Sequence, residues 1–282
     1  MLPAPDPLHA LLASVWPRLH TAIPLAASLG ADWAAMSRAF VHPPAGAPPL
    51  AHAGVLEIPM IIDGVATRVA GIHAVCTAAQ ARGQGHARRV LEPAIAWAQG
   101  WATTLLLHAV DPALYERFGF RAIEQWVFAA DVVQPPRTRT LRLLDHRDRA
   151  DVARVFAAFA GRVPVSQVLG IGEAAPLFVL DEVLACGGFG RLWWSEPLGC
   201  VVAATLEDRL LQLYDVVGPR WPALETLIAA FDGRVDRVEV FFAPDRWPEQ
   251  RWTRRPCMPP DVLMVRGPFT DADVVVPPLA RC

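Results

Sequence analysis

Two segments of the chain place chemically useful residues directly after short apolar strands. In the first, a strand predicted over residues 69–77 is followed by Arg82-Gly83-Gln84-Gly85-His86-Ala87, and an amphipathic helix leaves this turn. The two glycines remove Cβ atoms where another group could approach the backbone. The first N–H groups of a helix lack partners within it, and its dipole favours an anion. The turn is a candidate phosphate site, although such turns also make plain tight corners in α/β folds.

The second segment follows an apolar strand predicted over residues 104–110. Its sequence is Asp111-Pro112-Ala113-Leu114-Tyr115-Glu116-Arg117-Phe118-Gly119-Phe120. Asp111 is a favourable N-cap, and Pro112 suits the first helical position, where its missing N–H costs nothing. The pattern therefore predicts a short helix that carries Tyr115 and ends at Gly119.

Together the two segments resemble the GNAT superfamily of acyl-CoA-dependent N-acyltransferases. That superfamily has a pyrophosphate signature, Arg/Gln-x-x-Gly-x-Gly/Ala, and a later signature, Tyr-x-x-x-Gly-Phe, separated by one helix and one strand. The resemblance covers roughly residues 50–132. The residues that match the signatures are Arg82, Gly85 and Ala87, then Tyr115, Gly119 and Phe120.

The resemblance implies a binding site for acetyl-CoA. Backbone amides from Gly83 to Arg88 would hold the pyrophosphate, and the strand end at Val75 would splay from its neighbour and lend backbone groups to the acyl-pantetheine arm. A buried strand without this role has the same sequence pattern. The expected cofactor-binding residues are Val75, Cys76, Thr77, Arg82, Gly83, Gln84, Gly85, His86, Ala87 and Arg88.

By the same resemblance, Tyr115 would be the general acid that protonates the departing thiolate of CoA. A phenol with a pKa of ~10 is a suitable proton donor at neutral pH. The alternative is a core tyrosine that packs its helix onto the sheet. Cys76 lacks a His/Asp partner set in the sequence, so we interpret it as a small buried apolar residue rather than a nucleophile.

The sequence does not identify the general base. His73 alternates with Val75 on its strand and could face an acceptor cleft, or it could be a satisfied core histidine. Glu57 on the preceding strand is a second candidate, with an exposed edge carboxylate as the alternative. Asp111 could bind a cationic acceptor, although an N-cap role competes. Water relays could replace the base candidates.

The remaining pattern predicts two domains, residues 1–135 and residues 136–282, joined near Gln134-Pro135-Pro136. Residues 8–40 have helical patterning. A hairpin is predicted at Asp63-Gly64, and a strand over Trp126–Val132 completes the first domain. The second domain is predicted to contain strands, then a helix over residues 222–231 and a strand over Val262–Arg266. This order of elements repeats that of the first domain. We expect a mixed α/β fold of two tandem GNAT-like domains, each a mixed twisted sheet flanked by helices.

The second domain is expected to be degenerate. At the turn equivalent to the pyrophosphate loop the chain has Val217-Gly218-Pro219-Arg220-Trp221-Pro222, without the signature and with two prolines. This arrangement of one intact and one degenerate GNAT unit is similar to that of the enhanced-intracellular-survival type of aminoglycoside acetyltransferase. Those proteins carry a third, sterol-carrier-like domain, which this chain is expected to lack. In that family the terminal carboxylate helps in the active site, a role that Cys282 would have to fill here.

Composition excludes several classes of protein. The 282-residue chain is 53% hydrophobic, which excludes wholesale disorder and allows two domains. A net charge of −2 without charge blocks disfavours nucleic-acid binding. Its 5 scattered cysteines indicate neither a zinc ribbon nor a disulfide framework. No apolar run reaches ~18 residues and no secretory signal is evident. We expect a cytoplasmic protein with no metal, membrane or nucleic-acid partner.

The resulting hypothesis is an acetyl-CoA-dependent N-acetyltransferase that transfers the acetyl group to a small amine by direct ternary-complex attack. An aminoglycoside, a polyamine, an amino acid or a peptide amine could be the acceptor. The alternative is a non-catalytic acyl-CoA-binding regulatory protein. A purely structural interaction protein would bind no CoA.

Overall fold

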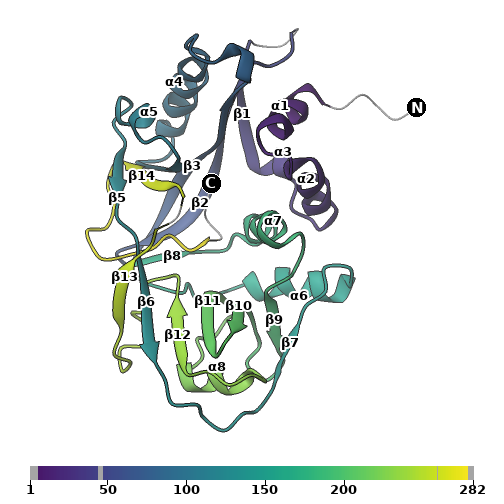
Figure 1. Cartoon of the computed structure of the whole chain (residues 1–282), viewed down its shortest axis with the longest axis vertical. Helices are drawn as coiled ribbons and strands as arrows, with labels where there is room; N and C mark the ends of the chain where they lie inside the picture. The colour runs from purple at the N-terminus through teal and green to yellow at the C-terminus, as the bar shows by residue number, and fades with distance from the viewer. Residues whose placement is uncertain (1–5, 44–46, 259, 279–282) are drawn as a thin grey trace.

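The computed structural model describes residues 6–43, 47–258 and 260–278, which form two seven-stranded mixed sheets flanked by helices (Figure 1). The first sheet has the order β1-β2-β3-β4-β14-β5, with β8 paired to β2. Its strands are β1 (Ser37–His42), β2 (Ala51–Ile62), β3 (Val65–Thr77), β4 (Thr104–Ala109), β5 (Arg121–Ile123), β8 (Leu169–Ile171) and β14 (Val262–Arg266).

The second sheet has the order β13-β6-β12-β11-β10-β9-β7. Its strands are β6 (Trp126–Asp131), β7 (Leu141–Leu143), β9 (Leu192–Ser195), β10 (Cys200–Glu207), β11 (Leu210–Val217), β12 (Arg237–Val240) and β13 (Thr253–Pro256). The helices are α1 (Pro7–Val15), α2 (Leu19–Ser28), α3 (Trp33–Met36), α4 (His86–Gln99), α5 (Ala113–Glu116), α6 (Arg149–Phe159), α7 (Ala175–Cys186) and α8 (Leu224–Ala230), with a short 3₁₀ turn, η1 (Ala79–Ala81). Within the described ranges no helix is long and apolar enough to cross a membrane.

The centre of the first sheet follows the predicted elements. The β2–β3 hairpin turns at Asp63 and Gly64, both at positive φ. Helix α4 packs on β1, β2 and β3 through Val90, Leu91 and Ile95, which are all buried. The helical spacing of its apolar residues was therefore interpreted correctly.

The two sheets exchange strands, which the sequence analysis did not anticipate. Strand β6 pairs with β12 and β13, so it belongs to the second sheet and does not complete the first. Strand β14 lies in the first sheet, antiparallel to both β4 and β5. Local patterning predicts a strand but not its partner, and here the apolar strand β14 is buried in the middle of the earlier sheet. The predicted boundary at residue 135 therefore does not separate the two sheets.

The edge of the first sheet also differs from the prediction. Helical patterning was expected to continue to residue 40, but the chain leaves α3 at Met36 and forms β1 over Ser37–His42. This strand pairs with β2 along its whole length. Pairing with β2 at the edge of the sheet therefore outweighs the local helical pattern of this segment.

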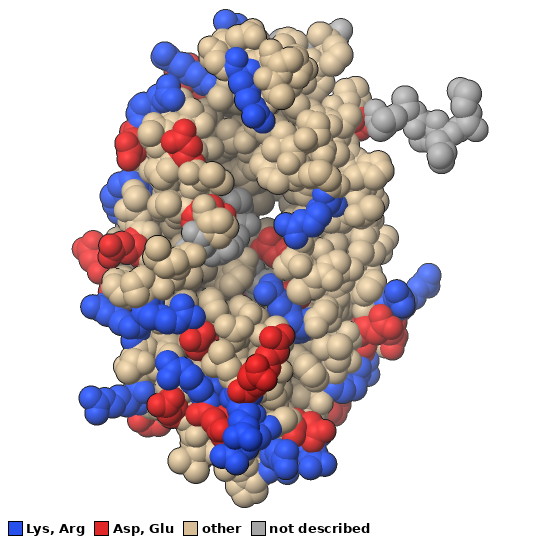
Figure 2. Space-filling model, viewed as in Figure 1, with Lys and Arg blue, Asp and Glu red and all other residues tan. Residues whose placement is uncertain are grey.

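The second sheet repeats the central order of the first. Strands β10 and β11 form an antiparallel hairpin, α8 follows, and β12 pairs in parallel with β11, as β4 does with β3. Figure 2 shows arginines and acidic residues interspersed over the half of the molecule that holds this second sheet. The predicted architecture of two mixed sheets flanked by helices is confirmed.

Helix α7 lies between the two sheets (Figure 1). Its Leu177 packs in the core of the first sheet, whereas Phe178, Leu180 and Val183 pack in the core that α7 shares with α2, α6 and the second sheet. Helix α7 therefore brings side chains of the second half of the chain to the carboxyl end of the first sheet.

Candidate active site

Strands β3 and β4 are parallel neighbours that separate toward their carboxyl ends. Their pairing runs from Val69 and Thr104 to Gly71 and Leu106, while β3 continues to Thr77 and β4 to Ala109. The register between β2 and β3 shifts at the same level, so that Ala74 and Val75 have no partner in β2. Ala74 has a φ of 50°, which marks a bulge that turns this part of β3 out of the ladder.

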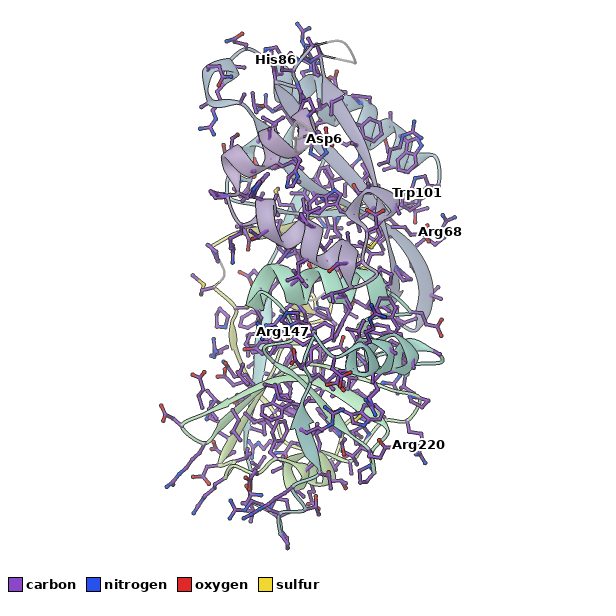
Figure 3. All side chains as sticks on the ribbon, turned by 90° about the vertical axis from the view of Figure 1, so that its right-hand side faces the viewer. Asp6, Arg68, His86, Trp101, Arg147 and Arg220 are labelled. Atoms are coloured by element: carbon purple, nitrogen blue, oxygen red, sulfur yellow. The ribbon has the colours of Figure 1, made fainter. Side chains whose placement is uncertain are left out.

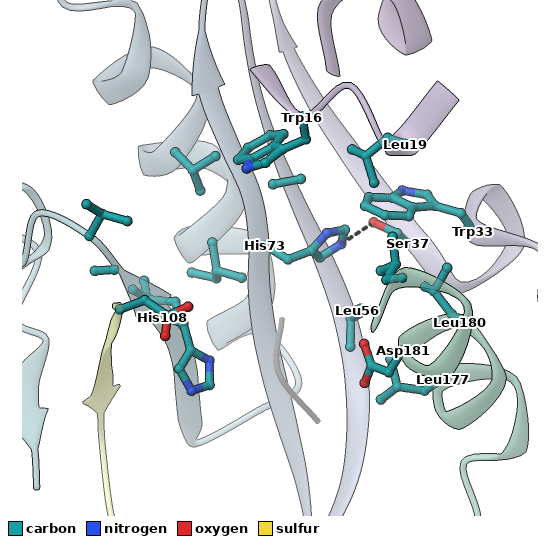
Figure 4. A pocket seen from close by; sticks show the side chains of 18 of the residues that line it. Trp16, Leu19, Trp33, Ser37, Leu56, His73, His108, Leu177, Leu180 and Asp181 are labelled. Atoms are coloured by element: carbon teal, nitrogen blue, oxygen red, sulfur yellow. Dashed lines mark hydrogen bonds between the residues drawn. The ribbon is translucent and has the colours of Figure 1, made fainter. Parts of the chain in front are cut away.

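A cavity of about 660 Å³ opens at this split. One side is formed by β3, β4 and α5, including Val75 and Tyr115, and the opposite side by α3 and α7. The site is therefore built from both halves of the chain, and Figure 4 shows the side chains converging on it from these elements.

The glycine-rich turn leads from the split to the start of α4. Gly83 and Gly85 have φ values of 76° and 79°, and a Cβ placed on either would meet no heavy atom within 4 Å. Gly85 is the N-cap residue, and no side chain caps the helix. The first N–H groups of α4 therefore face open space, as a site for phosphate groups requires.

The predicted arginines lie beside this turn. Arg82 donates from Nε to the carbonyl oxygen of Thr77 at 3.3 Å, which holds its side chain at the end of β3. Arg88 pairs with Glu92 at 2.6 Å, one helical turn away, so part of its charge is compensated.

The structure adds His42 to this basic surface, which sequence reasoning missed. The rings of His42 and His86 lie 5.1 Å apart. Desolvation and the positive charges of Arg89 and His86 hold the pKa of His42 below its ordinary value. His86 lies at one end of the molecule, at the start of α4 (Figure 3). No sequence signal links His42 to this turn, because the antiparallel pairing of β1 brings it there.

Tyr115 lies at the cavity wall on the short helix α5 and is only 7% exposed. Burial, with the nearby Asp111 and Cys76 groups, raises the pKa of its phenol to about 12. The phenol is therefore protonated at neutral pH. Helix α5 begins later than predicted: Pro112 is the N-cap, no side chain caps the helix, and Asp111 is an exposed residue at the cavity.

His73 reaches the cavity from β3 but is held as a core residue. Its Nε2 lies 2.7 Å from the hydroxyl of Ser37, and its ring makes an edge contact with Trp33 at 4.9 Å. A Cβ on Gly54 would lie 2.5 Å from the ring, so the bulged ladder needs glycine there. Burial, together with His52, lowers the pKa of His73 to about 3. The imidazole is neutral in the folded protein at physiological pH.

We expect the buried neutral His73 to make the fold less stable in acid. In the unfolded chain the imidazole regains its ordinary pKa of 6.5, whereas in the fold it stays near 3. Unfolding therefore takes up a proton below pH 6.5. The free energy of unfolding should fall by about 1.4 kcal/mol for each unit by which the pH is lowered below this value. Urea denaturation at about pH 7, 6 and 5 measures this slope, and His73→Gln should reduce it. An unchanged slope in that variant would show that His73 does not carry it.

Two predicted residues lie away from the cavity. Glu57 follows the cavity-lining Leu56 on β2, so its side chain lies on the other face of the sheet. It is half exposed and accepts two hydrogen bonds from Arg68, at 2.8 and 2.7 Å. Cys76 packs against α1 instead of the cavity, and burial raises the pKa of its thiol to about 11. Neither is positioned to act on an acceptor, and the Cys76 thiol is not activated.

The second half of the chain supplies residues that sequence reasoning missed. Asp181 and Arg191 line the cavity from α7 and from the segment before β9, and Asp261 lines it from the segment before β14. Arg191 pairs with the buried Glu182 at 2.5 Å and lies over the ring of Tyr214 at 4.4 Å. No local motif marks these residues, because the fold alone brings them to the first sheet.

The equivalent split in the second sheet is filled by aromatic side chains. Strands β11 and β12 pair from Leu210 to Leu213, and β11 then continues beyond β12 to Val217 while still paired with β10. Trp247, which is 1% exposed, packs there with Trp221 at 4.8 Å and Phe242 at 5.9 Å. Its indole donates to the carbonyl of Pro222 at 3.0 Å. This packing leaves the second unit without the open split of the first.

Comparison with known proteins agrees with this geometry. Residues 50–123 match the family model described as the acetyltransferase (GNAT) domain. No protein of curated function matches the chain significantly. A probable N-acyltransferase from Enterococcus faecalis V583 has a similar structure, with a TM-score of 0.51 and 14% identity over 78% of this chain and 59% of its own. Eis1 from Mycobacterium abscessus has a TM-score of 0.50 and 15% identity over 78% of this chain and 62% of its own.

The chain thus spans about 60% of the length of each of these two structures. At such low identity the likeness concerns the fold, whereas the match to the family model covers the split, the glycine-rich turn and Tyr115. Residues 50–123 therefore match a GNAT acetyltransferase domain, and they lie within a mixed α/β fold of two sheets that is similar to the fold of these two structures.

Proposed function

We propose that the protein is an acetyl-CoA-dependent N-acetyltransferase whose acceptor is the amine of a small molecule. The observation that carries the proposal is that three features are built around the carboxyl end of β3 and the loop that follows it: the uncapped, glycine-rich start of α4, the split between β3 and β4, and the cavity that contains Tyr115. The proposal is that a long thioester lies along them with its phosphates at the turn and its acyl group in the cavity. Acetyl-CoA supplies the activated acyl group.

The fit of the phosphates rests on the backbone. Gly83 and Gly85 both have open space where a Cβ would be, and no side chain caps the first amides of α4. Arg82 and Arg89 provide positive charge around this turn, and the rings of His42 and His86 lie beside it. A pyrophosphate is favoured here by both the helix dipole and these side chains.

In the split, the bulge at Ala74 and Val75 frees backbone groups from the β2 ladder. An N–H in this position can stabilise the negative charge that develops on a thioester carbonyl oxygen. In the transfer, a C–N bond forms as the C–S bond breaks. Tyr115 then donates its proton to the thiolate leaving group, and its pKa of about 12 keeps that proton available at neutral pH.

The amine must lose a proton before or during attack. His73 faces the cavity, but its pKa of about 3 makes it a weak base. Because His73 is a weak base, we propose that the acceptor attacks as the neutral amine, and that water in the cavity takes up the proton released from its nitrogen once the C–N bond has formed. Residue 135 divides the chain along its sequence, whereas strands β6 and β14 each pair in the sheet of the other half.

Amine-dependent release of the CoA thiol tests the proposal. Acetyl-CoA alone should release thiol slowly, and a suitable amine should raise the rate at least about 10-fold over that background, since general acid catalysis alone commonly supplies 10²-fold or more. A non-catalytic acyl-CoA-binding protein would bind CoA by calorimetry and release no additional thiol with any amine of a broad panel. That result would favour the regulatory alternative.

A further inference from the structure

The bulge in β3 leaves the carbonyl of Ala74 without a partner in the β2 ladder. The side chain of His52, on β2, takes the place of that partner, and its Nδ1 lies 2.8 Å from the carbonyl oxygen. Because a carbonyl oxygen can only accept a hydrogen bond, Nδ1 carries the hydrogen and donates it. His52 also pairs with Cys76 in the ladder, so this one residue holds β3 on both sides of Val75.

The conformation at Ala74 needs such a contact. Its φ of 50° lies in the left-handed region, which costs free energy for a residue with a Cβ and persists only where surrounding groups hold it. The preceding residue, His73, is held by the hydroxyl of Ser37 (Figure 4). His52 is fully buried, and burial lowers the pKa of its ring, which is therefore neutral at physiological pH. Contacts of two buried histidine rings therefore hold the bulge.

The hydrogen bond to Ala74 also fixes the direction of the next N–H. The carbonyl of Ala74 and the N–H of Val75 belong to one planar trans peptide group, so they point in opposite directions. With the carbonyl held toward the His52 ring, the N–H of Val75 points away from that ring. Val75 lines the cavity and has no ladder partner in β2 or in β4. Its N–H is therefore a donor whose direction depends on His52.

We propose, on the basis of the function proposed above, that His52 is a positioning residue whose hydrogen bond to Ala74 aims the N–H of Val75 at the carbonyl oxygen of the bound thioester. A donor stabilises the negative charge that develops on this oxygen most strongly when it is directed there before the reaction begins. The described residues that line the cavity do not include His52, so it acts through the backbone of β3.

Substitutions at His52 test this role. An Asn side chain can place its amide nitrogen about where Nδ1 lies, whereas Gln places it about where Nε2 lies. His52→Asn should therefore keep kcat within about threefold of the wild type, and His52→Gln should lower kcat at least about 10-fold, as expected when a donor to the developing charge is lost. Both variants should keep the wild-type affinity for CoA, because the developing charge exists only in the transition state.

Ile58→Ala is the control for a general loss of stability. Ile58 is fully buried on the same face of β2 as His52 and packs in the core formed with β8 and β14. Removing its methyl groups should lower the free energy of unfolding and leave kcat at the wild-type value. Kinetics measured at a temperature where every variant is folded then separate lost positioning from lost stability.

NMR of the Val75 amide provides a readout that does not depend on turnover. Adding acetyl-CoA without an amine should move the amide proton of Val75 downfield relative to adding CoA, because CoA lacks the thioester carbonyl. His52→Asn should keep this difference, and His52→Gln should abolish it.

Wild-type kcat in a folded His52→Gln variant would overturn the inference. So would equal losses of kcat in His52→Asn and His52→Gln, or a Val75 amide that responds equally to CoA and acetyl-CoA. If Val75 responds to acetyl-CoA as described but no amine accelerates thiol release, the proposed function fails while the role of His52 in aiming this N–H stands.

Discussion

Tyr115→Phe should lower kcat about 100-fold or more and leave CoA binding nearly unchanged. The substitution removes one oxygen from a side chain that is only 7% exposed, and Phe fills nearly the same volume. Loss of a general acid typically costs 10² to 10⁴ in rate. If Tyr115 only packs α5 onto the sheet, kcat should hardly change. Steady-state kinetics with a reactive amine, under conditions where chemistry limits the rate, measure the difference.

Tyr214→Phe is the matched control, because Tyr115 and Tyr214 are the 2 tyrosines of the chain. The hydroxyl of Tyr214 donates to Gln212 at 3.2 Å, and both residues belong to β11 of the second sheet. This variant should retain wild-type kcat. Because the pKa of Tyr115 is about 12, acid catalysis should also persist into the alkaline range instead of declining near pH 10. Wild-type kcat in Tyr115→Phe would remove the phenol from the mechanism.

Gly85→Glu should weaken CoA binding at least ~100-fold, because a like charge opposite a phosphate costs several kcal/mol. The new carboxylate would stand at the N-cap of α4, where a Cβ meets no atom of the protein within 4 Å and the side chain would reach the open anion site. The φ of 79° adds strain for any residue with a Cβ. Calorimetry with CoA should give one site per wild-type chain and no measurable heat in the variant.

Gly64→Glu is the matched control, because it introduces the same charge and a similar backbone strain away from the turn. Gly64 has a φ of 78° and equally open surroundings, but it lies in the β2–β3 hairpin at the opposite end of β3. It should bind CoA like the wild type. Wild-type affinity in a folded Gly85→Glu variant, or a second CoA site per chain, would contradict the assignment of the turn. The aromatic packing of Trp247 and Trp221 is the reason to expect a single site.

Local features of the first domain could be predicted from the sequence. The hairpin at Asp63-Gly64, the amphipathic α4 and the helix of Tyr115 each depend on residues close together in the chain. The sequence analysis predicted that Gly83 and Gly85 leave the backbone open to another group. The structure has both glycines at positive φ. The start of α5 was misplaced because Pro112 fits the N-cap as well as the first helical position.

The parts that depend on distant pairing could not be predicted. Strand β14 has an ordinary apolar pattern, and nothing local shows that its partners are β4 and β5. Helix α7 is buried on almost all sides, including at Asp181 and Glu182, so it lacks the apolar stripe that marks a surface helix. Asp181 was missed for this reason, whereas Arg191 and Asp261 reach the cavity from segments that only the fold brings there.

His73 shows a different limit. Its position on an apolar strand was compatible with either a base or a core residue. The contact with Ser37 shows that His73 is a core residue. Ser37 lies on β1, in a segment where the sequence analysis expected a helix. Burial and the neighbouring His52 then lower the pKa of His73 and keep its ring neutral.

Analysis of a single turnover tests direct transfer, the central claim, most directly. Enzyme in excess over acetyl-CoA carrying a labelled acetyl group is mixed with an amine that accelerates thiol release, and the masses of the products and of the protein are measured by mass spectrometry. We predict equal amounts of the labelled amide and free CoA, with no change in the mass of the protein. A labelled protein, or labelled acetate in place of the amide, would contradict the account.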